Sequence, residues 1–241
     1  MHQVIPIQFT QVIHWCLDLL YPPRCGGCGR VGVGLFCAKC KAQSISLCLS
    51  EDLNCSSEHL LDIEGGEPLP VFSAALFAGP MREAVHHFKY NGTPQLANSL
   101  GSFFGPLSHS LNLFDDPHKA IVPVPLYATR LRQRGYNQSE LLARQLSQHV
   151  GISVKPHWMA RTRSTEQQAR LNSKQRGENV RGAFAAVPDV RNHHIFLVDD
   201  VFTTGSTLAE CARVLRQAGA ARVTAITLTR AMRSDDFPHP S

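Results

Sequence analysis

The residues best suited to chemistry lie in one run near the C-terminal end of the chain. Asp199 and Asp200 follow four apolar residues, 195–198, which are typical of a central parallel strand buried on both faces. A turn of small hydroxyl residues around a glycine comes next and leads into a predicted helix. Such a turn can direct backbone N–H groups, hydroxyls and the helix N-terminus at one phosphate. Its residues are Thr203, Thr204, Gly205, Ser206 and Thr207.

The two carboxylates suggest what carries that phosphate. A carboxylate that accepts two hydroxyl hydrogen bonds is well suited to the diol of a sugar. The plainer interpretation is a strand end followed by a helix cap, but capping needs one hydroxyl and no acidic pair. A Walker loop is excluded because no Gly-Lys-Ser/Thr sequence ends the turn. The run therefore indicates a site for a phosphorylated sugar.

A second cluster of reactive residues consists of four cysteines. Cys25 and Cys28 form one Cys-x-x-Cys pair, and Cys37 and Cys40 form another. Two thiolates three positions apart can grip a metal ion from a tight turn, and four complete a closed tetrahedral zinc site. A redox site would need only one pair, at the start of a βαβ unit. We therefore predict a structural zinc site.

The other four cysteines suggest no second metal site. Cys48 and Cys55 lack partners at metal-binding spacing and are expected to be free. Cys16 and Cys211 lie in apolar helical patterns and are expected to be core residues.

Alternating strands and helices must position the acidic pair and the turn. The pattern predicts strands at 71–78, 120–125, 195–198 and 222–228, and helices at 80–90, 94–113, 138–150 and 207–218. Alternation of this kind predicts an α/β fold, a mainly parallel sheet with helices on both faces. We expect three parts: an N-terminal helix and zinc module at 1–55, a linker at 56–70, and the α/β domain at 71–241.

Charge and hydropathy narrow the functional classes. The chain has 24 basic and 19 acidic residues, a net charge of +5. Six basic and two acidic residues fall between Arg161 and Arg181, which suits an anionic partner without identifying it.

The apolar stretch 5–20 lacks a basic leading region and a cleavage site, and is shorter than the ~20 residues that span a bilayer. We expect a cytoplasmic protein with reduced thiols.

Several motifs, in order along the chain, carry a resemblance to a known family. They occupy 20–25, 88–92, 122–126, 134–143, 167–171 and 176–184, and end with the acidic pair and the turn. Together they resemble the ComF family, whose bacterial members include ComF and GntX. The resemblance implies a zinc-ribbon-like module followed by a type I phosphoribosyltransferase domain. It also implies phosphoribosyl pyrophosphate with Mg²⁺ as ligand, and a role in natural transformation or in the use of external DNA.

Basic residues provide candidates for the pyrophosphate side of such a ligand. Lys89 ends a predicted helix, where it either favours the helix C-terminus or, by the resemblance, contacts pyrophosphate. Arg130, Arg132 and Arg134 follow the strand at 120–125 and form either a solvated face or, as we favour, a pyrophosphate-binding loop.

A long polar stretch without helical or strand periodicity, 162–181, provides further candidates. It is either a flexible connection or a functional loop. Phosphoribosyltransferases close a mobile hood over their substrate, and Arg163, Arg170 and Arg176 are candidates for that hood.

Three functions remain open on these residues. The first is an enzyme that transfers the phosphoribosyl group, although no general base for a nucleobase can be named. The second is a non-catalytic sensor of a phosphoribosyl metabolite. The third is a module that binds single-stranded DNA or an uptake protein. Aromatic residues make up only 7% of the chain and do not interleave with the basic stretch, which argues against a strong base-stacking platform.

Overall fold

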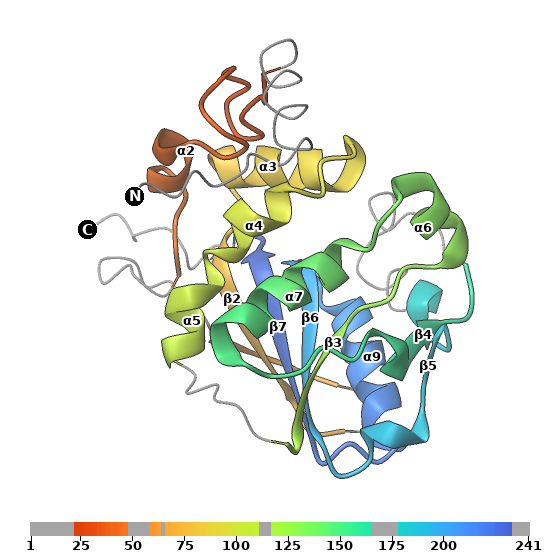
Figure 1. Cartoon of the computed structure of the whole chain (residues 1–241). Helices are drawn as coiled ribbons and strands as arrows, with labels where there is room; N and C mark the ends of the chain where they lie inside the picture. Colours follow the sequence, from red (N-terminus) through yellow and green to blue (C-terminus); the bar gives the residue numbers. More distant parts are fainter. Residues whose placement is uncertain (1–21, 48–57, 64–65, 111–116, 165–177, 233–241) are drawn as a thin grey trace, which may run out of the picture.

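A five-stranded sheet lies at the centre of the fold, in the order β1-β2-β7-β6-β3 (Figure 1). Its strands are β1 (Glu58–Leu61), β2 (Leu69–Leu76), β3 (Lys119–Pro123), β6 (His194–Phe202) and β7 (Arg222–Arg230). Four of them run parallel, and β1 pairs with β2 antiparallel at one edge. The predicted α/β class with a mainly parallel sheet is therefore confirmed.

The computed structural model describes residues 22–47, 58–63, 66–110, 117–164 and 178–232. Several predictions lie outside these ranges: the helix within 5–20, the state of Cys16, Cys48 and Cys55, and the hood candidates Arg170 and Arg176. No helix among the described residues is long and apolar enough to cross a membrane.

Helices cover both faces of the sheet (Figure 1). One face packs against α3 (Gly79–Tyr90), α4 (Leu96–Gly101), α5 (Phe104–Ser110) and α7 (Gln138–Val150), and the other against α9 (Ser206–Gln217). Because strand side chains alternate, Phe196 and Val198 of β6 join the first core, whereas Ile195 and Leu197 join the second. Each face of β6 is thus buried, as the apolar run predicted.

The bounds of α7 agree with its predicted range, and its two ends show why. Asn137 caps the helix, its side-chain oxygen accepting a 3.1 Å hydrogen bond from the Ser139 backbone N–H. Gly151 ends the helix in the left-handed conformation, with φ 74°.

The helix predicted at 94–113 is instead divided into α4 and α5. Pro106 has no backbone N–H to donate, so a continuous helix would lose a hydrogen bond at this position. Pro106 is the third residue of α5 and so lies in the first turn of that helix. Backbone N–H groups in a first turn have no partner within the helix, so a proline costs no hydrogen bond there.

Other elements differ from the expectations as well. Strand β6 does not end at 198 but continues to Phe202, because its pairing with β7 continues through Asp199 and Val201. The expected loop around Arg130 is a helix, α6 (Ala128–Arg134), closed by Gly135 with φ 79°. Part of the expected linker forms β1. The only apolar residues of this strand are two adjacent leucines, so it lacks the alternation from which a strand is predicted.

A small second sheet and a short helix complete the described elements. Strands β4 (Met159–Arg161) and β5 (Phe184–Ala186) pair antiparallel, between the 3₁₀ turns η1 (Pro156–Trp158) and η3 (Pro188–Val190). Near the N-terminus, α2 (Ala38–Ala42) carries one cysteine of the predicted metal site.

Candidate functional site

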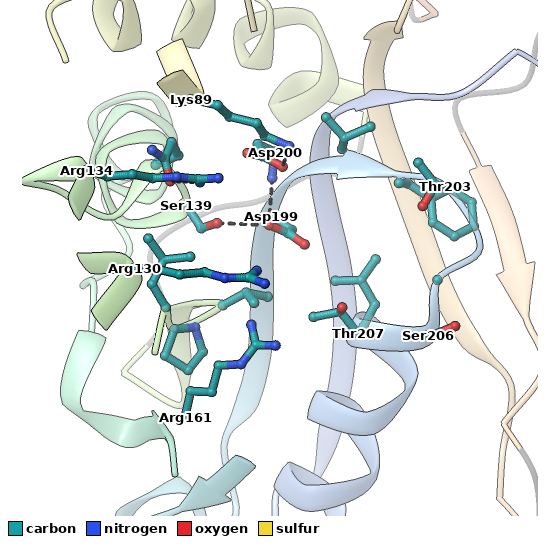
Figure 2. A pocket seen from close by; sticks show the side chains of 18 of the residues that line it. Lys89, Arg130, Arg134, Ser139, Arg161, Asp199, Asp200, Thr203, Ser206 and Thr207 are labelled. Atoms are coloured by element: carbon teal, nitrogen blue, oxygen red, sulfur yellow. Dashed lines mark hydrogen bonds and ion pairs between the residues drawn. The ribbon is translucent and has the colours of Figure 1, made fainter. Parts of the chain in front are cut away.

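A cavity of about 560 Å³ opens where β6 and β3 end (Figure 2). Ligands in open α/β sheets bind at the carboxyl ends of the strands, so this is the expected position. The acidic pair and the whole turn that the sequence singled out line it: Asp199, Asp200, Thr203, Thr204, Gly205, Ser206 and Thr207.

The turn is held in a conformation that only glycine suits. Gly205 has φ +77°, and a Cβ there would lie 2.5 Å from Leu61 Cδ2 and 2.8 Å from Phe202 Cε2. Thr204 Oγ1 and Ser206 Oγ lie 3.1 Å apart. The Ala209 backbone N–H donates to the Gly205 carbonyl at 2.8 Å, so helix α9 begins at this turn, whose residues line the cavity.

The two carboxylates have different surroundings. Asp200 is 7% exposed, and its Oδ1 lies 2.9 Å from Lys89 Nζ. Asp199 Oδ1 accepts hydrogen bonds from Ser139 Oγ and from the Asp200 backbone N–H, both at 2.9 Å. Burial, and then the neighbouring Asp200 carboxylate, raise the pKa of Asp199 to about 6, against the opposing effect of Lys89. Helix α3 therefore supplies the counter-charge of the acidic pair.

Helix α6 directs two of its three arginines at the cavity. Arg130 and Arg134 are four residues apart, hence on one face of the helix, and both line the cavity. Arg132 is exposed and does not line it. Arg134 donates a 2.9 Å hydrogen bond to Gln138 Oε1 and lies 5.0 Å from the centre of the Tyr90 ring.

A further cationic residue of the cavity, Arg161 at the end of β4, was not identified from sequence. Its guanidinium lies 5.2 Å from the ring centre of Phe184, its partner across the two-stranded sheet. Burial, and then the charge of Arg130, lower the pKa of Arg161. The only sign of a role for Arg161 in the sequence is that it begins the basic stretch 161–181. Strand β4, which positions it, has three residues and is too short to predict from periodicity.

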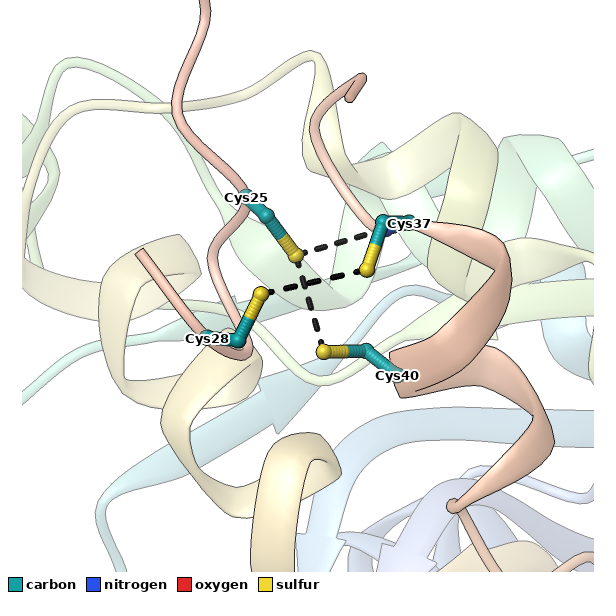
Figure 3. A group of neighbouring side chains, drawn as sticks. All are labelled: Cys25, Cys28, Cys37 and Cys40. Atoms are coloured by element: carbon teal, nitrogen blue, oxygen red, sulfur yellow. Dashed lines mark hydrogen bonds between the residues drawn. The ribbon is translucent and has the colours of Figure 1, made fainter. Parts of the chain in front are cut away.

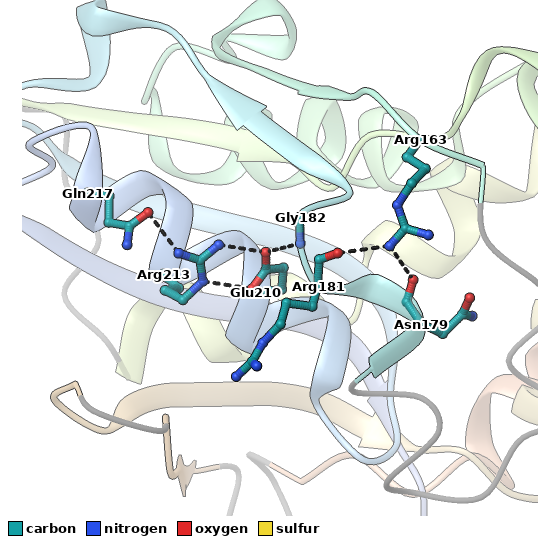
Figure 4. Close-up of polar contacts among 7 residues, drawn as sticks. All are labelled: Arg163, Asn179, Arg181, Gly182, Glu210, Arg213 and Gln217. Carbon is teal, nitrogen blue, oxygen red and sulfur yellow. Dashed lines mark hydrogen bonds and ion pairs between the residues drawn. The ribbon is translucent and has the colours of Figure 1, made fainter.

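The predicted hood residue Arg163 does not reach the cavity. Its Nη2 donates to the backbone carbonyls of Asn179 and Arg181, at 3.0 and 2.8 Å (Figure 4). Close by, the Gly182 backbone N–H donates to Glu210 Oε1 at 2.7 Å, which attaches the same segment to α9. Arg163 thus fixes the chain that leads into β5 rather than a ligand.

The four cysteines of the predicted metal site converge (Figure 3). The sulfurs of Cys25 and Cys40 are 3.7 Å apart, those of Cys28 and Cys37 are 3.8 Å apart, and all four lie within 4.8 Å of one another. A tetrahedron with metal–sulfur bonds of about 2.3 Å has edges of about 3.8 Å. The separations are far too long for disulfide bonds. The cluster could therefore hold one metal ion.

Local hydrogen bonds and packing support the cysteine cluster. Burial acts to raise the pKa of the Cys25 thiol, but backbone N–H groups, that of Cys37 foremost, outweigh it and lower the pKa to about 6. A thiolate is thereby favoured at Cys25, whereas burial and hydrogen bonds to the neighbouring sulfurs raise the pKa of Cys40. A Cβ on Gly27 would lie 2.9 Å from Cys40 Sγ, so the turn between the first two cysteines approaches the sulfurs too closely for any larger residue.

Similar proteins have been described. A family model, the phosphoribosyl transferase domain, matches residues 102–239. The DNA utilization protein YhgH of Escherichia coli is 30% identical over 214 residues, which are 85% of this chain and 92% of YhgH. Competence protein F of Haemophilus influenzae is 40% identical over 47% of this chain and 51% of its own length. Competence protein ComFC of Bacillus subtilis is 33% identical over 62% of this chain and 60% of its own.

The fold, the cavity and the domain match define the class: this is a protein with a phosphoribosyltransferase domain. The extent of the match to YhgH, together with the two competence proteins, shows more. The chain belongs to the ComF family, and the resemblance seen in its sequence motifs is confirmed.

Proposed function

We propose that this protein binds phosphoribosyl pyrophosphate with Mg²⁺ and transfers its phosphoribosyl group in the uptake or use of DNA. The observation that carries the proposal is the cavity, in which an acidic pair, a hydroxyl-rich turn at a helix N-terminus and several cations face one ligand-sized space. The DNA context is supported by the names of the relatives, which are competence and DNA utilization proteins.

Each part of the ligand has a suitable partner among the lining residues. The 5-phosphate would bind the turn at 203–207 through backbone N–H groups and hydroxyls. Asp199 and Asp200 would accept hydrogen bonds from the ribose diol and, as hard oxygen donors, suit Mg²⁺ held jointly with the phosphates. Pyrophosphate would lie near Lys89, Arg130 and Arg134.

The reaction would depend on positioning and on charge. The bond between the anomeric carbon and pyrophosphate breaks through an oxocarbenium-like state, while the acceptor forms its bond at the same carbon. Fixed cations stabilise the negative charge that develops on the departing pyrophosphate, and Mg²⁺ supplies further charge neutralisation when bound.

The cysteine cluster belongs to this proposal as a structural zinc site. Four thiolates and no open ligand position are the donor set of closed zinc sites, and the sulfur separations fit the ion. The zinc would hold the N-terminal module, with no part in the chemistry.

One titration tests the ligand. Calorimetry with phosphoribosyl pyrophosphate and Mg²⁺ should show binding to the wild type, and at least tenfold weaker binding to the Asp199→Asn/Asp200→Asn double variant. No binding by the wild type would refute the proposal. Binding without pyrophosphate release across a panel of nucleobases would leave a sensor of the same ligand as the better description.

A further inference from the structure

We propose that the cysteine module, residues 22–47, positions the ligand cavity through helix α3, so that metal binding and ligand binding strengthen each other. The inference rests on the proposed function and extends it. Besides holding the module together, the metal holds Lys89 beside the acidic pair. The two coupled sites are the four cysteines and the cavity, and α3 is the element that joins them.

The turn between the first two cysteines lies directly on α3. A Cβ on Gly26 would lie 3.5 Å from Ala84 Cα in the middle of α3, and 3.1 Å from Leu96 Cδ1 in α4. Because Gly26 has no side chain, its backbone meets the backbone of α3 without a side chain between them. Figure 1 shows the module packed beside α3, with α2 next to the helix.

The module and α3 also share one hydrophobic core. Cys25, Phe36 and Cys40 are buried in the same cluster as the inward-facing residues of α3, which are Met81, Ala84, Val85 and Phe88. The Phe36 ring extends this contact to Phe103, between α4 and α5, with 6.4 Å between the ring centres. Loss of the ordered module would therefore remove part of the packing that holds α3 in place.

The C-terminal turn of α3 carries this packing to the cavity. Phe88 lies four residues after Ala84, hence on the same face of the helix, and Lys89 follows it. Lys89 lines the cavity, with its Nζ 2.9 Å from Asp200 Oδ1. The Tyr136 hydroxyl donates a hydrogen bond to the Phe88 carbonyl. The module at Ala84 and Tyr136 at Phe88 thus hold α3 at two points, and together they set the position of the Lys89 ammonium group.

The metal determines whether the module can hold α3. The one helix that the structure describes within residues 22–47 is α2, which has five residues. Small modules with so little regular structure commonly fold only with their metal bound. In the metal-loaded state the turn is fixed against Ala84, whereas in the metal-free state α3 and Lys89 are held by fewer contacts. The ligand binds the first state better because Lys89 is then in place at the acidic pair.

The coupling must be reciprocal. If the metal raises the affinity for the ligand by some factor, the ligand raises the affinity for the metal by the same factor. Couplings of this kind are commonly between five- and 150-fold, and we expect about tenfold here. A module that only held itself together would show no coupling at all.

The first test separates the module from α3 without touching a cysteine. Gly26→Val keeps all four sulfurs but places a branched side chain against Ala84 and Leu96. The zinc-loaded variant should bind phosphoribosyl pyrophosphate with Mg²⁺ about tenfold more weakly than the wild type by calorimetry. Val33→Ser, in an exposed loop of the same module, and Ile195→Val, in the core on the other face of the sheet, are the controls for a changed module and for lost stability. Both should bind the ligand like the wild type.

The second test uses the unaltered chain and measures the reverse effect. Zinc release from the wild type to a competing chelator should be followed at fixed Mg²⁺, with and without phosphoribosyl pyrophosphate. The ligand should raise the apparent zinc affinity about tenfold, matching the first test. Gly26→Val should show little of this increase, which also controls for zinc taken up by the ligand itself. This measurement stands even if Gly26→Val does not fold.

The possible outcomes separate this inference from the proposed function. If the wild type binds phosphoribosyl pyrophosphate but zinc release is the same with and without it, the inference fails and the proposed function stands. Unchanged ligand affinity in zinc-loaded Gly26→Val would overturn it as well. A wild type that does not bind the ligand refutes the proposed function. Hydrogen exchange in residues 84–90 then still tests the positioning, since zinc removal should speed it and an unchanged rate would contradict the contact with α3.

Discussion

Lys89, in the last turn of α3, places its Nζ 2.9 Å from Asp200 Oδ1 in β6, and the two side chains are 22% and 10% exposed. From the sequence, Lys89 either favours the helix C-terminus or contacts pyrophosphate, and the structure adds a third role, an ion pair with the acidic pair. The position of α3 therefore places a positive charge beside the Asp200 carboxylate.

Removing one member of this pair should cost more than removing both. Lys89→Met leaves Asp200 as a largely buried carboxylate without this partner, and we expect a loss of about 3 kcal/mol in the free energy of unfolding. The double variant Lys89→Met/Asp200→Asn should recover at least half of that loss. Urea unfolding of both variants and of Asp200→Asn measures the coupling. Additive effects of the single changes would show that the ion pair is not what stabilises this contact.

The raised pKa of Asp199 predicts a pH-dependent stability. Its pKa of about 6 in the folded chain lies above the ordinary value of 3.8, so this group favours the folded state below pH 3.8 and loses that contribution as pH rises through 6. Asp199→Asn keeps an oxygen for Ser139 but cannot ionise. We expect its stability relative to the wild type to increase by about 2 kcal/mol between pH 4 and pH 8. Unfolding curves at the two pH values test this, with the exposed Asp189→Asn as control; a constant difference would contradict it.

The turn at Gly205 should be intolerant of any side chain. Gly205→Ala combines a left-handed backbone with a contact of 2.5 Å to Leu61, so we expect a loss of about 2–4 kcal/mol and weaker ligand binding. Gly135→Ala is the matched control: its φ of +79° is similar, but nothing lies within 4 Å of the added Cβ. That control should cost about 1 kcal/mol. Thermal unfolding of both variants gives the comparison. Equal losses of stability would show that the contact with Leu61 does not contribute to the effect of Gly205→Ala.

The metal site should depend on Gly27. We expect one zinc per chain, and we expect Gly27→Ala to lose it, because the new Cβ would lie 2.9 Å from Cys40 Sγ. Gly29→Ala strains the backbone of a neighbouring turn residue, whose φ is +73°, but brings no atom within 4 Å of its Cβ, so it should cost about 1 kcal/mol and keep the metal. Metal content of the purified variants decides the point. Retention of zinc by Gly27→Ala would show that the sulfurs have more room than their separations indicate.

Features set by short stretches of sequence were predictable, and features set by distant contacts were not. The acidic pair, the turn and the four cysteines were found because each motif consists of recognisable residue types at short, fixed spacings in the sequence. The cap at Asn137 and the glycine at 151 likewise determine α7 locally. Arg161 owes its place in the cavity to a three-residue strand and to Phe184, more than twenty positions away, which no local pattern encodes.

The hydrogen bonding of the sheet has a consequence for where the phosphoribosyltransferase unit begins. The match to the domain family starts at residue 102, but β2, which pairs with β7 along the centre of the sheet, lies before it. So do Lys89 and Leu61, which contact the acidic pair and the turn. A fragment cut at the family boundary would expose unpaired backbone groups along the nine residues of β7, the kind of edge that pairs with other chains. The segment that the domain family matches is therefore shorter than the segment that must fold as one piece.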